Sequence, residues 1–281
     1  MKCISCKNES MERFSEKSYL ELPVFHCKKC NFFVTGESKS EILEKTQSIY
    51  QDKHWGENNL WDAKTAINSN YTDIDSQGKK RHWISQLKYC QQYLENKNSI
   101  LEIGAGQGQA TFWFDSKGFT VTGVEPDENN VNLINQKLNN SNCIVESAED
   151  FHIDKKFDIV WMSHVLEHLI NPVKFFEKIQ HNLDNDGVFF IEVPNCENKS
   201  MLNSSIFLVP HTFHFSKVAL INLAENSGFK VIQCDYFRPA TRSEGILNKL
   251  TRSKLKKFQY YPRIITNGKE GRFLRMILKK N

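Results

Sequence analysis

The chain has 281 residues, enough for one large domain or for one domain with a small additional module. Hydrophobic residues make up 40% and charged residues 25%, a balance typical of a globular protein rather than a disordered one. The net charge of +4 permits a nucleic-acid partner without requiring one. There is no run of 18 apolar residues and no apolar signal core after Met1, which excludes a transmembrane helix and favours a cytoplasmic protein.

Residues 1–36 carry two C-x-x-C pairs separated by 20 residues. Four thiolates fill the tetrahedral coordination of zinc, so the spacing predicts a closed structural site in a small zinc ribbon. Disulfides or free thiols are the alternatives, and a reducing cytosol disfavours disulfides. A segment this short buries little core, so the metal would supply much of its folding free energy. The predicted ligands are Cys3, Cys6, Cys27 and Cys30.

Residues 37–95 are predicted to form a helical cover or linker. Residues 40–50 favour a helix, and residues 58–78 are polar and rich in turn formers. Residues 80–94 carry Trp83, Ile84, Leu87 and Tyr93, the pattern of an amphipathic helix that leads into the first strand of the main domain.

The main domain, residues 96–281, opens on an apolar run at 100–103 that ends in Gly104, Gly106 and Gly108. The run predicts a buried parallel strand, and the glycines predict a sharp turn into a helix. Glycine allows a tight turn and lets a ligand approach the backbone closely. A dinucleotide fingerprint would need a third glycine at position 109, which is glutamine here. The spacing therefore favours a different nucleotide-type ligand.

Three further strands follow in order. The second, at residues 119–124, ends in Glu125, about where an acidic residue grips two ribose hydroxyls. Asp127 is predicted to cap the next helix. The third strand lies at 143–146, and the fourth, at 157–162, runs into Ser163 and a cluster of histidines.

Alternating helices and strands continue to the end of the chain and predict an α/β fold. A helix begins at Pro172 and precedes a fifth strand at 188–193, and Ser216 and Gly228 bracket another helix. Strands are predicted at 229–237 and 272–278, with a basic insertion at about 238–271 between them.

These motifs resemble motif I and its successors in the class I S-adenosylmethionine (SAM) methyltransferases. The resemblance implies a Rossmann-like, seven-stranded methyltransferase sheet that binds SAM over the glycine turn. It implies that Glu149, or else Asp150, meets the adenine amino group, and that Arg81 pairs with the SAM carboxylate. The predicted cofactor-binding residues are Glu102, Gly104, Ala105, Gly106, Gly108, Glu125, Pro126, Ala148, Glu149, Ser163 and Arg81.

The chain is most similar to the ubiquinone-biosynthesis O-methyltransferase subgroup, through residues 101–108, 123–126, 164–168, 187–195 and 214–216. The cluster at 164–168 also matches the H-x-x-E-H pattern of inverzincin proteases, an interpretation that its place after a sheet strand argues against. It is closer to the E-x-x-E-H metal motif of the subgroup, which implies a possible second metal near Glu167 and His168, with His211 or His214 as a further ligand. His164 stands where the first glutamate would be.

Because a hydroxyl acceptor must lose its proton, the predicted catalytic bases are His164, His168 and His214, with His211 as a further candidate. The expected activity is O-methylation of a sugar, a glycan precursor or another small hydroxylated metabolite. One alternative is an RNA methyltransferase that holds its substrate with the ribbon and the basic insertion. Another is a SAM-binding scaffold without catalysis. The base N-methyltransferase motif Asn-Pro-Pro-aromatic does not occur. The acceptor and the oligomeric state are not encoded in any motif.

Overall fold

The computed structural model describes residues 1–49, 80–252 and 254–281. Its main feature is an eight-stranded sheet in the order β11-β10-β12-β8-β7-β4-β5-β6. Five parallel strands form one half: β6 (Asn142–Val145), β5 (Thr120–Glu125), β4 (Ser99–Ile103), β7 (Phe157–Ser163) and β8 (Leu183–Pro194). The antiparallel half comprises β12 (Phe273–Lys280), β10 (Phe229–Pro239) and β11 (Arg263–Thr266).

This sheet confirms the predicted α/β fold and corrects its strand count. The seven expected strands are present, and the eighth, β11, comes from the basic insertion. Ile264 and its neighbours pair with the end of β10, which extends to Pro239. The insertion also forms α9 (Arg242–Thr251) and α10 (Lys256–Gln259). The fifth strand begins at Leu183 rather than Val188, because α6 ends at Asn182 and the chain enters the sheet directly.

Side-chain alternation along the strands gives the sheet two apolar faces. Ile100, Ile159 and Phe190 pack on one face against α3 (Lys80–Cys90) and α4 (Gln109–Ser116). Leu101 and Val160 pack on the other face, together with Phe189, Ile191 and Val193 of β8. This face is covered by α6 (Pro172–Asn182) and α8 (Lys217–Asn226). Two covered faces explain why these strands are almost continuously apolar.

Helices α5 (Glu128–Asn135), α8 and α6 differ in how a side chain caps their first turn. Helix α5 is capped by the Asp127 side chain, and α8 by the Ser216 side chain, as predicted. Asn171 precedes α6 without a side-chain cap bond. The sequence pattern did not predict α7 (Lys199–Phe207). The short 3-10 helices η3 (Gln91–Tyr93) and η4 (Leu166–His168) complete this part of the chain.

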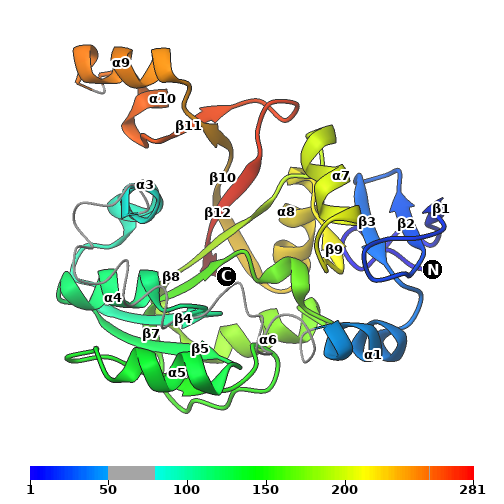
Figure 1. The fold of residues 1–281 in the computed structure, drawn as a ribbon, viewed down its shortest axis with the longest axis horizontal. Helices are drawn as coiled ribbons and strands as arrows, with labels where there is room; N and C mark the ends of the chain where they lie inside the picture. The colour runs from blue at the N-terminus through cyan, green and yellow to red at the C-terminus, as the bar shows by residue number, and fades with distance from the viewer. Residues whose placement is uncertain (50–79, 253) are drawn as a thin grey trace.

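The N-terminal segment forms a second sheet in the order β1-β2-β3-β9. Strands β1 (Glu12–Ser15), β2 (Val24–Cys27) and β3 (Phe32–Thr35) are followed by α1 (Lys39–Ile49). The fourth strand, β9 (Phe213–His214), belongs to the main domain and pairs with β3. Backbone hydrogen bonds therefore join the N-terminal segment to the main domain, and the two sheets share one apolar core, with the N-terminal sheet at the right of Figure 1. No helix among the described residues is long and apolar enough to span a membrane.

A buried ion pair joins the parallel and antiparallel halves of the main sheet. The register places Arg275 of β12 opposite Glu192 of β8, and Glu192 opposite Ser163 of β7. Arg275 Nε donates to Glu192 Oε2 at 2.5 Å, and both side chains are fully buried. A second guanidinium nitrogen of Arg275 donates to the Ser85 hydroxyl of α3. Although burial alone would raise it, the Arg275 charge holds the pKa of Glu192 well below its ordinary value.

Replacing Arg275 with leucine is expected to lower the free energy of unfolding by about 3–5 kcal/mol, because the buried Glu192 carboxylate loses its guanidinium partner. The double variant Arg275→Leu, Glu192→Leu should recover most of that loss, since neither charge then remains. Denaturant unfolding measures both. The control is Arg272→Leu, which removes an exposed arginine from the segment before β12. A single variant as stable as the control would contradict this account of the pair.

Candidate functional site: a donor turn and a polar cavity

The glycine turn lies between β4 and α4 and requires left-handed backbone at three positions. Gly104, Gly106 and Gly108 have φ values of 73°, 57° and 73°. A Cβ at Gly104 would lie 2.3 Å from Val165, and one at Gly108 would lie 2.6 Å from Ile134, so close packing accounts for these two glycines. A Cβ at Gly106 would meet nothing within 4 Å. The middle of the turn is therefore open for a ligand to approach the backbone.

Glu125 lies at the carboxyl end of β5, next to this turn. Its Oε2 accepts a 2.7 Å hydrogen bond from the Gly106 backbone N–H, and its Oε1 accepts one from Asp127. The neighbouring strand β4 supplies Glu102, whose carboxyl group accepts a hydrogen bond from the Thr111 hydroxyl. Burial raises the pKa of Glu102 to about 8. Two acidic residues thus flank the turn, as predicted from their spacing.

The other predicted cofactor-binding residues after β5 and β6 make contacts within the chain. Both carboxylate oxygens of Glu149 accept backbone N–H bonds, from Ile170 at 3.0 Å and from Asn171 at 2.6 Å, so this side chain caps the start of α6. The Asp150 carboxylate accepts a hydrogen bond from the Ser147 hydroxyl. Ala148 packs against the core and Pro126 is exposed. An adenine contact by Glu149 stays a prediction. The predicted Arg81 side chain lies outside the described residues.

A cavity of about 540 Å³ extends from the glycine turn. Its floor includes the turn itself, Glu102, Ala105 and Trp161, and its walls come from α3, from the end of β7 and from the insertion. The insertion contributes Pro262 and Arg263, and α3 contributes His82 and Trp83. The basic insertion therefore lines part of the cavity. The remaining lining residues are Gly104, Gly106, Gln107, Gln109, Ala110, Ser163 and His164.

His164 lines this cavity in a left-handed conformation with φ of 58°. Its Nδ1 lies 3.3 Å from Glu167 and its Nε2 lies 3.3 Å from Glu192. Burial opposes protonation, but the hydrogen bonds to these two carboxylates raise the pKa of His164 to about 10. His164 is therefore a cation at neutral pH. That charge state argues against the predicted role as a general base.

The other predicted histidines form a separate group behind η4. His214, on β9, is 2% exposed, with Nε2 paired to Thr35 and Nδ1 paired to Ser205. Burial lowers its pKa to about 3. Its position between the two sheets, outside the cavity lining, argues against a role as acceptor base.

His168 and His211 lie edge to face, with ring centroids 4.5 Å apart. Burial lowers the pKa of His211 far below its ordinary value, so its ring is neutral. One ligand atom from each of Glu167, His168 and His211 lies within 4.8 Å of the others. The predicted grouping therefore includes His211 and leaves out His164 and His214. A second metal at this place stays a prediction.

Sequence reasoning missed His82 and Glu192, which meet inside the cavity wall. His82 Nε2 lies 3.1 Å from Glu192 Oε1. The Gln86 side-chain amide nitrogen lies 3.1 Å from the same Nε2, and because an amide nitrogen only donates, Nε2 accepts this hydrogen bond. Nδ1 is buried and has no hydrogen-bond partner among the described residues. Burial lowers the pKa of His82 below its ordinary value of 6.5, against the opposing effect of Glu192. A glutamate within the apolar strand at 188–193 was the one available signal.

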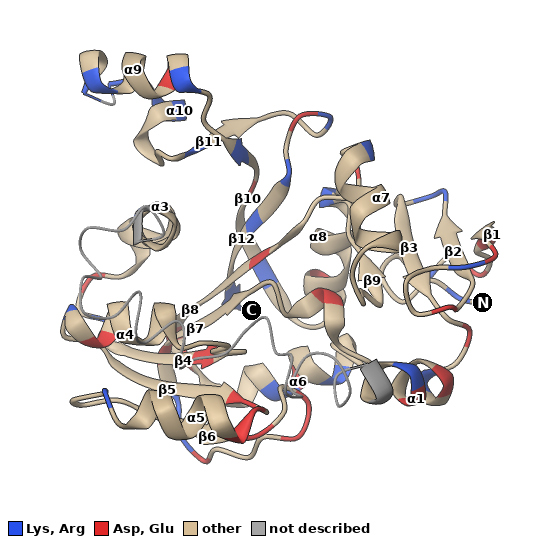
Figure 2. Cartoon of the chain, in the orientation of Figure 1, with Lys and Arg blue, Asp and Glu red and all other residues tan. Residues whose placement is uncertain are grey.

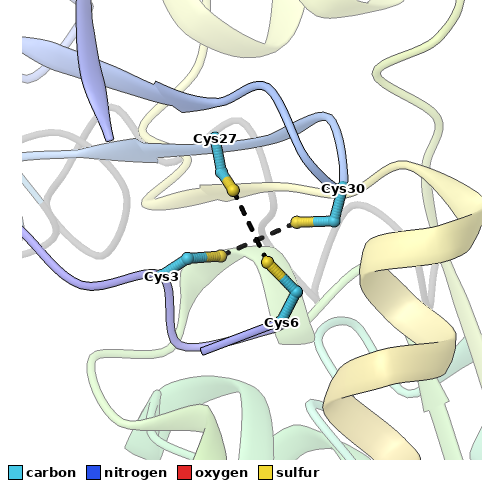
Figure 3. Close-up of side chains that lie close together, drawn as sticks. All are labelled: Cys3, Cys6, Cys27 and Cys30. Carbon is cyan, nitrogen blue, oxygen red and sulfur yellow. Dashed lines mark hydrogen bonds between the residues drawn. The ribbon is translucent and has the colours of Figure 1, made fainter. Parts of the chain in front are cut away.

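The four N-terminal cysteines converge between β2, β3 and the first turn of the chain (Figure 3). The sulfur–sulfur distances are 3.6 Å for Cys3–Cys30 and 3.6 Å for Cys6–Cys27. All eight cysteines are free, and the four ligand atoms lie within 4.8 Å of one another. A tetrahedral site with zinc–sulfur bonds of about 2.3 Å has sulfur–sulfur edges of about 3.8 Å. The spacing fits a zinc tetrahedron.

The sheet order, the open glycine turn with its two acidic neighbours and the cavity beyond it are features of the class I SAM-dependent methyltransferase fold. Residues 75–234, more than half of the chain, match the family described as "Methyltransferase domain". The chain belongs to this methyltransferase-domain family.

Curated relatives are similar over part of their length. A ubiquinone biosynthesis O-methyltransferase of Rickettsia typhi is 27% identical over 111 residues, which cover 38% of this chain and 45% of the relative. An (S)-tetrahydroprotoberberine N-methyltransferase of Eschscholzia californica is 26% identical over 112 residues, covering 37% and 32%. The chain thus spans less than half the length of either relative.

Solved structures support the fold. A SAM-dependent methyltransferase from Archaeoglobus fulgidus superimposes with a TM-score of 0.53 at 19% identity, covering 75% of this chain and all of that one. The plantazolicin methyltransferase BamL, solved with a triazolic desmethylPZN analog and SAH, gives a TM-score of 0.55 at 16% identity over 87% of this chain and all of its own.

Replacing Glu125 with alanine is expected to weaken SAM binding at least roughly tenfold, because a charge-assisted hydrogen-bond acceptor contributes about 1.5–3 kcal/mol. Isothermal titration calorimetry measures the affinity. The matched control is Glu128→Ala, which removes an exposed carboxylate three residues further along the chain. Unchanged affinity in the Glu125 variant would show that the donor lies elsewhere.

Proposed function

We propose that this chain methylates a hydroxyl group of a small metabolite, such as a sugar or a glycan precursor, with SAM as the donor. The observation that carries the proposal is the position of His82 in the wall of the cavity that begins at the glycine turn. A cavity of this size, lined by both apolar and polar side chains, is suited to a small molecule.

When bound, SAM supplies an electrophilic methyl group on a positively charged sulfur. The open face at Gly106 and the carboxylate of Glu125 are suited to hold the donor. Trp161 and Trp83 line the cavity and supply apolar surface against which an acceptor can be oriented. Orientation of the two reactants accounts for much of the rate enhancement in reactions of this kind.

His82 is the base that the geometry favours for the acceptor proton. Its Nε2 lies 3.1 Å from Glu192 Oε1, so this carboxylate would stabilise the imidazolium that forms when the ring takes up the acceptor proton. Because burial lowers the pKa of His82, the ring is neutral at physiological pH, as a base must be. Arg275 keeps Glu192 ionised and thereby keeps a negative charge beside the His82 ring.

The relatives do not decide the acceptor atom, since their names include both O- and N-methyltransferases. A hydroxyl acceptor is favoured here because a neutral histidine supplies what a hydroxyl needs, a partner that removes its proton during transfer. RNA methylation is the second candidate, supported by the six lysines and arginines between residues 242 and 257.

The proposal is tested by methyl transfer from labelled SAM into an extract of the source cell, followed by identification of the labelled product. A labelled low-molecular-weight hydroxyl compound is the expected result. With that acceptor, kcat should fall as the pH drops through the pKa of His82, below 6.5, because protonation removes the base. His82→Ala should lower kcat by roughly 10²–10⁴-fold and abolish this acidic limb, with little change in the KM for SAM.

Labelled nucleic acid as the product would replace the small-molecule proposal by the RNA candidate. SAM binding without transfer to any acceptor would favour the scaffold alternative. A matched control for the histidine is His181→Ala, which alters a ring in the last turn of α6, outside the cavity lining. An unchanged acidic limb in His82→Ala would assign the proton transfer to another group.

We also propose that Cys3, Cys6, Cys27 and Cys30 hold a structural zinc ion. Their sulfur–sulfur distances and the closed set of four thiol ligands support it. The ion would brace the sheet that β3 shares with β9, and through it the turn at η4, since the Thr212 N–H donates to the Glu167 carbonyl. A closed site of this kind has no position for substrate.

Elemental analysis is expected to find about one zinc per chain. Removing it with a chelator should lower the melting temperature by roughly 10 °C or more, because the segment has little core of its own. Cys27→Ser should lose the metal, whereas Cys234→Ser, which alters a cysteine on β10, should retain it. A metal-free chain of unchanged stability would exclude the zinc site.

A further inference from the structure

Helix α9 is amphipathic, and its apolar side chains face away from the rest of the described chain. Its three large apolar side chains are exposed: Ile246 by 62%, Leu247 by 42% and Leu250 by 76%. None of its residues is buried against the described chain. The less exposed positions are Glu244, Gly245, Asn248 and Thr251, which are polar or lack a side chain. A helix of a globular protein ordinarily does the opposite, with its apolar stripe facing the core.

Polar contacts hold the helix in this orientation. The Glu244 carboxylate accepts two hydrogen bonds of 2.8 Å from the Arg238 guanidinium at the end of β10. Thr241 and Glu244 form a capping box at the helix start. Gly245 lies against the Tyr261 ring, where an added Cβ would be 3.2 Å from the hydroxyl oxygen. The inward face is thus fixed by a salt bridge and a close backbone approach, and the apolar residues point away.

Basic residues surround the apolar face. The stretch from 242 to 257 contains six lysines and arginines and a single acidic residue, Glu244, which is already paired with Arg238. Leu255, 50% exposed, is a further apolar residue at the start of α10, next to Lys256 and Lys257 in the chain. Figure 1 shows α9 projecting from the end of the molecule opposite the N-terminal sheet, and Figure 2 shows basic residues at both ends of the helix.

We propose that α9 and the start of α10 form an interfacial surface that binds an anionic lipid bilayer. Aliphatic side chains on one face with lysines and arginines beside them are the features by which a helix lies in a membrane interface. Nucleic acid would match the basic residues but would leave Ile246, Leu247 and Leu250 in water. The surface is a protruding helix rather than a groove, which suits a planar bilayer.

This surface is connected to the cavity by the chain itself. The insertion runs from α9 through α10 to Pro262 and Arg263, which line the cavity wall. Binding at α9 therefore holds the wall of the cavity near the lipid headgroups. The inference does not depend on the acceptor or on methyl transfer, because lipid binding is measured without SAM.

The test is flotation of the full chain with two kinds of vesicle. One consists of phosphatidylcholine alone, and the other also contains about 30% phosphatidylglycerol as the anionic lipid. Binding to the anionic vesicles and much weaker binding to the neutral ones are expected. The variant Ile246→Ser, Leu250→Ser should bind the anionic vesicles with at least roughly tenfold lower affinity, because each change removes one large aliphatic side chain from the surface that would contact the bilayer. Both positions are so exposed that the fold should be unaffected.

Leu208→Ser is the matched control, since Leu208 is 64% exposed after α7 and lies outside this surface. It should float as the unaltered chain does. The double variant Lys256→Glu, Lys257→Glu should lose the preference for anionic vesicles. The proposal is overturned if the chain floats with neither vesicle, or if the leucine and isoleucine variant floats as well as the control. It is also overturned if light scattering shows a dimer that this variant dissociates, because a second copy then covers the face.

Discussion

The fully buried pair of Glu192 and Arg275 is the interaction on which the site depends. Strand pairing places the two side chains opposite each other at the carboxyl end of β8, where the parallel and antiparallel halves of the sheet join. Arg275 keeps Glu192 ionised, and the ionised carboxylate in turn lies beside His82 and raises the pKa of His164. Burial keeps His82 neutral despite this carboxylate, whereas the carboxylates of Glu167 and Glu192 keep His164 charged. The neutral ring is available for proton transfer, and the charged ring is not.

The N-terminal sheet and the insertion support the site from opposite ends. Strand β9 completes the cysteine-bearing sheet and also carries the chain past η4, so the order of that sheet bears on the position of Glu167. The insertion adds β11 to the far edge of the main sheet and places Pro262 and Arg263 in the cavity wall.

Much of the fold was predictable because its signals are local. The apolar strands, the glycine turn, the caps at Asp127 and Ser216 and the cysteine spacing each depend on residues close in the chain. The burial and the charge states of the histidines were not predictable in this way. His164, His211 and His214 carry the same side chain in similar sequence surroundings, yet one is a cation between two carboxylates and the other two are neutral and buried. Burial and charge come from residues distant in sequence, and no local pattern records them.

The sequence by itself determined that the chain is an α/β methyltransferase with a turn for SAM and four clustered thiols. Strand periodicity, glycine conformation and ligand spacing are short-range properties that a single chain segment specifies. Only the tertiary structure decided which histidine meets Glu192, that the insertion lines the cavity, and that α9 presents its apolar face to the outside. Each of these results from strand register or from helix orientation. Both are set by contacts between segments such as β8, β12 and α3, whose residues lie up to 190 positions apart.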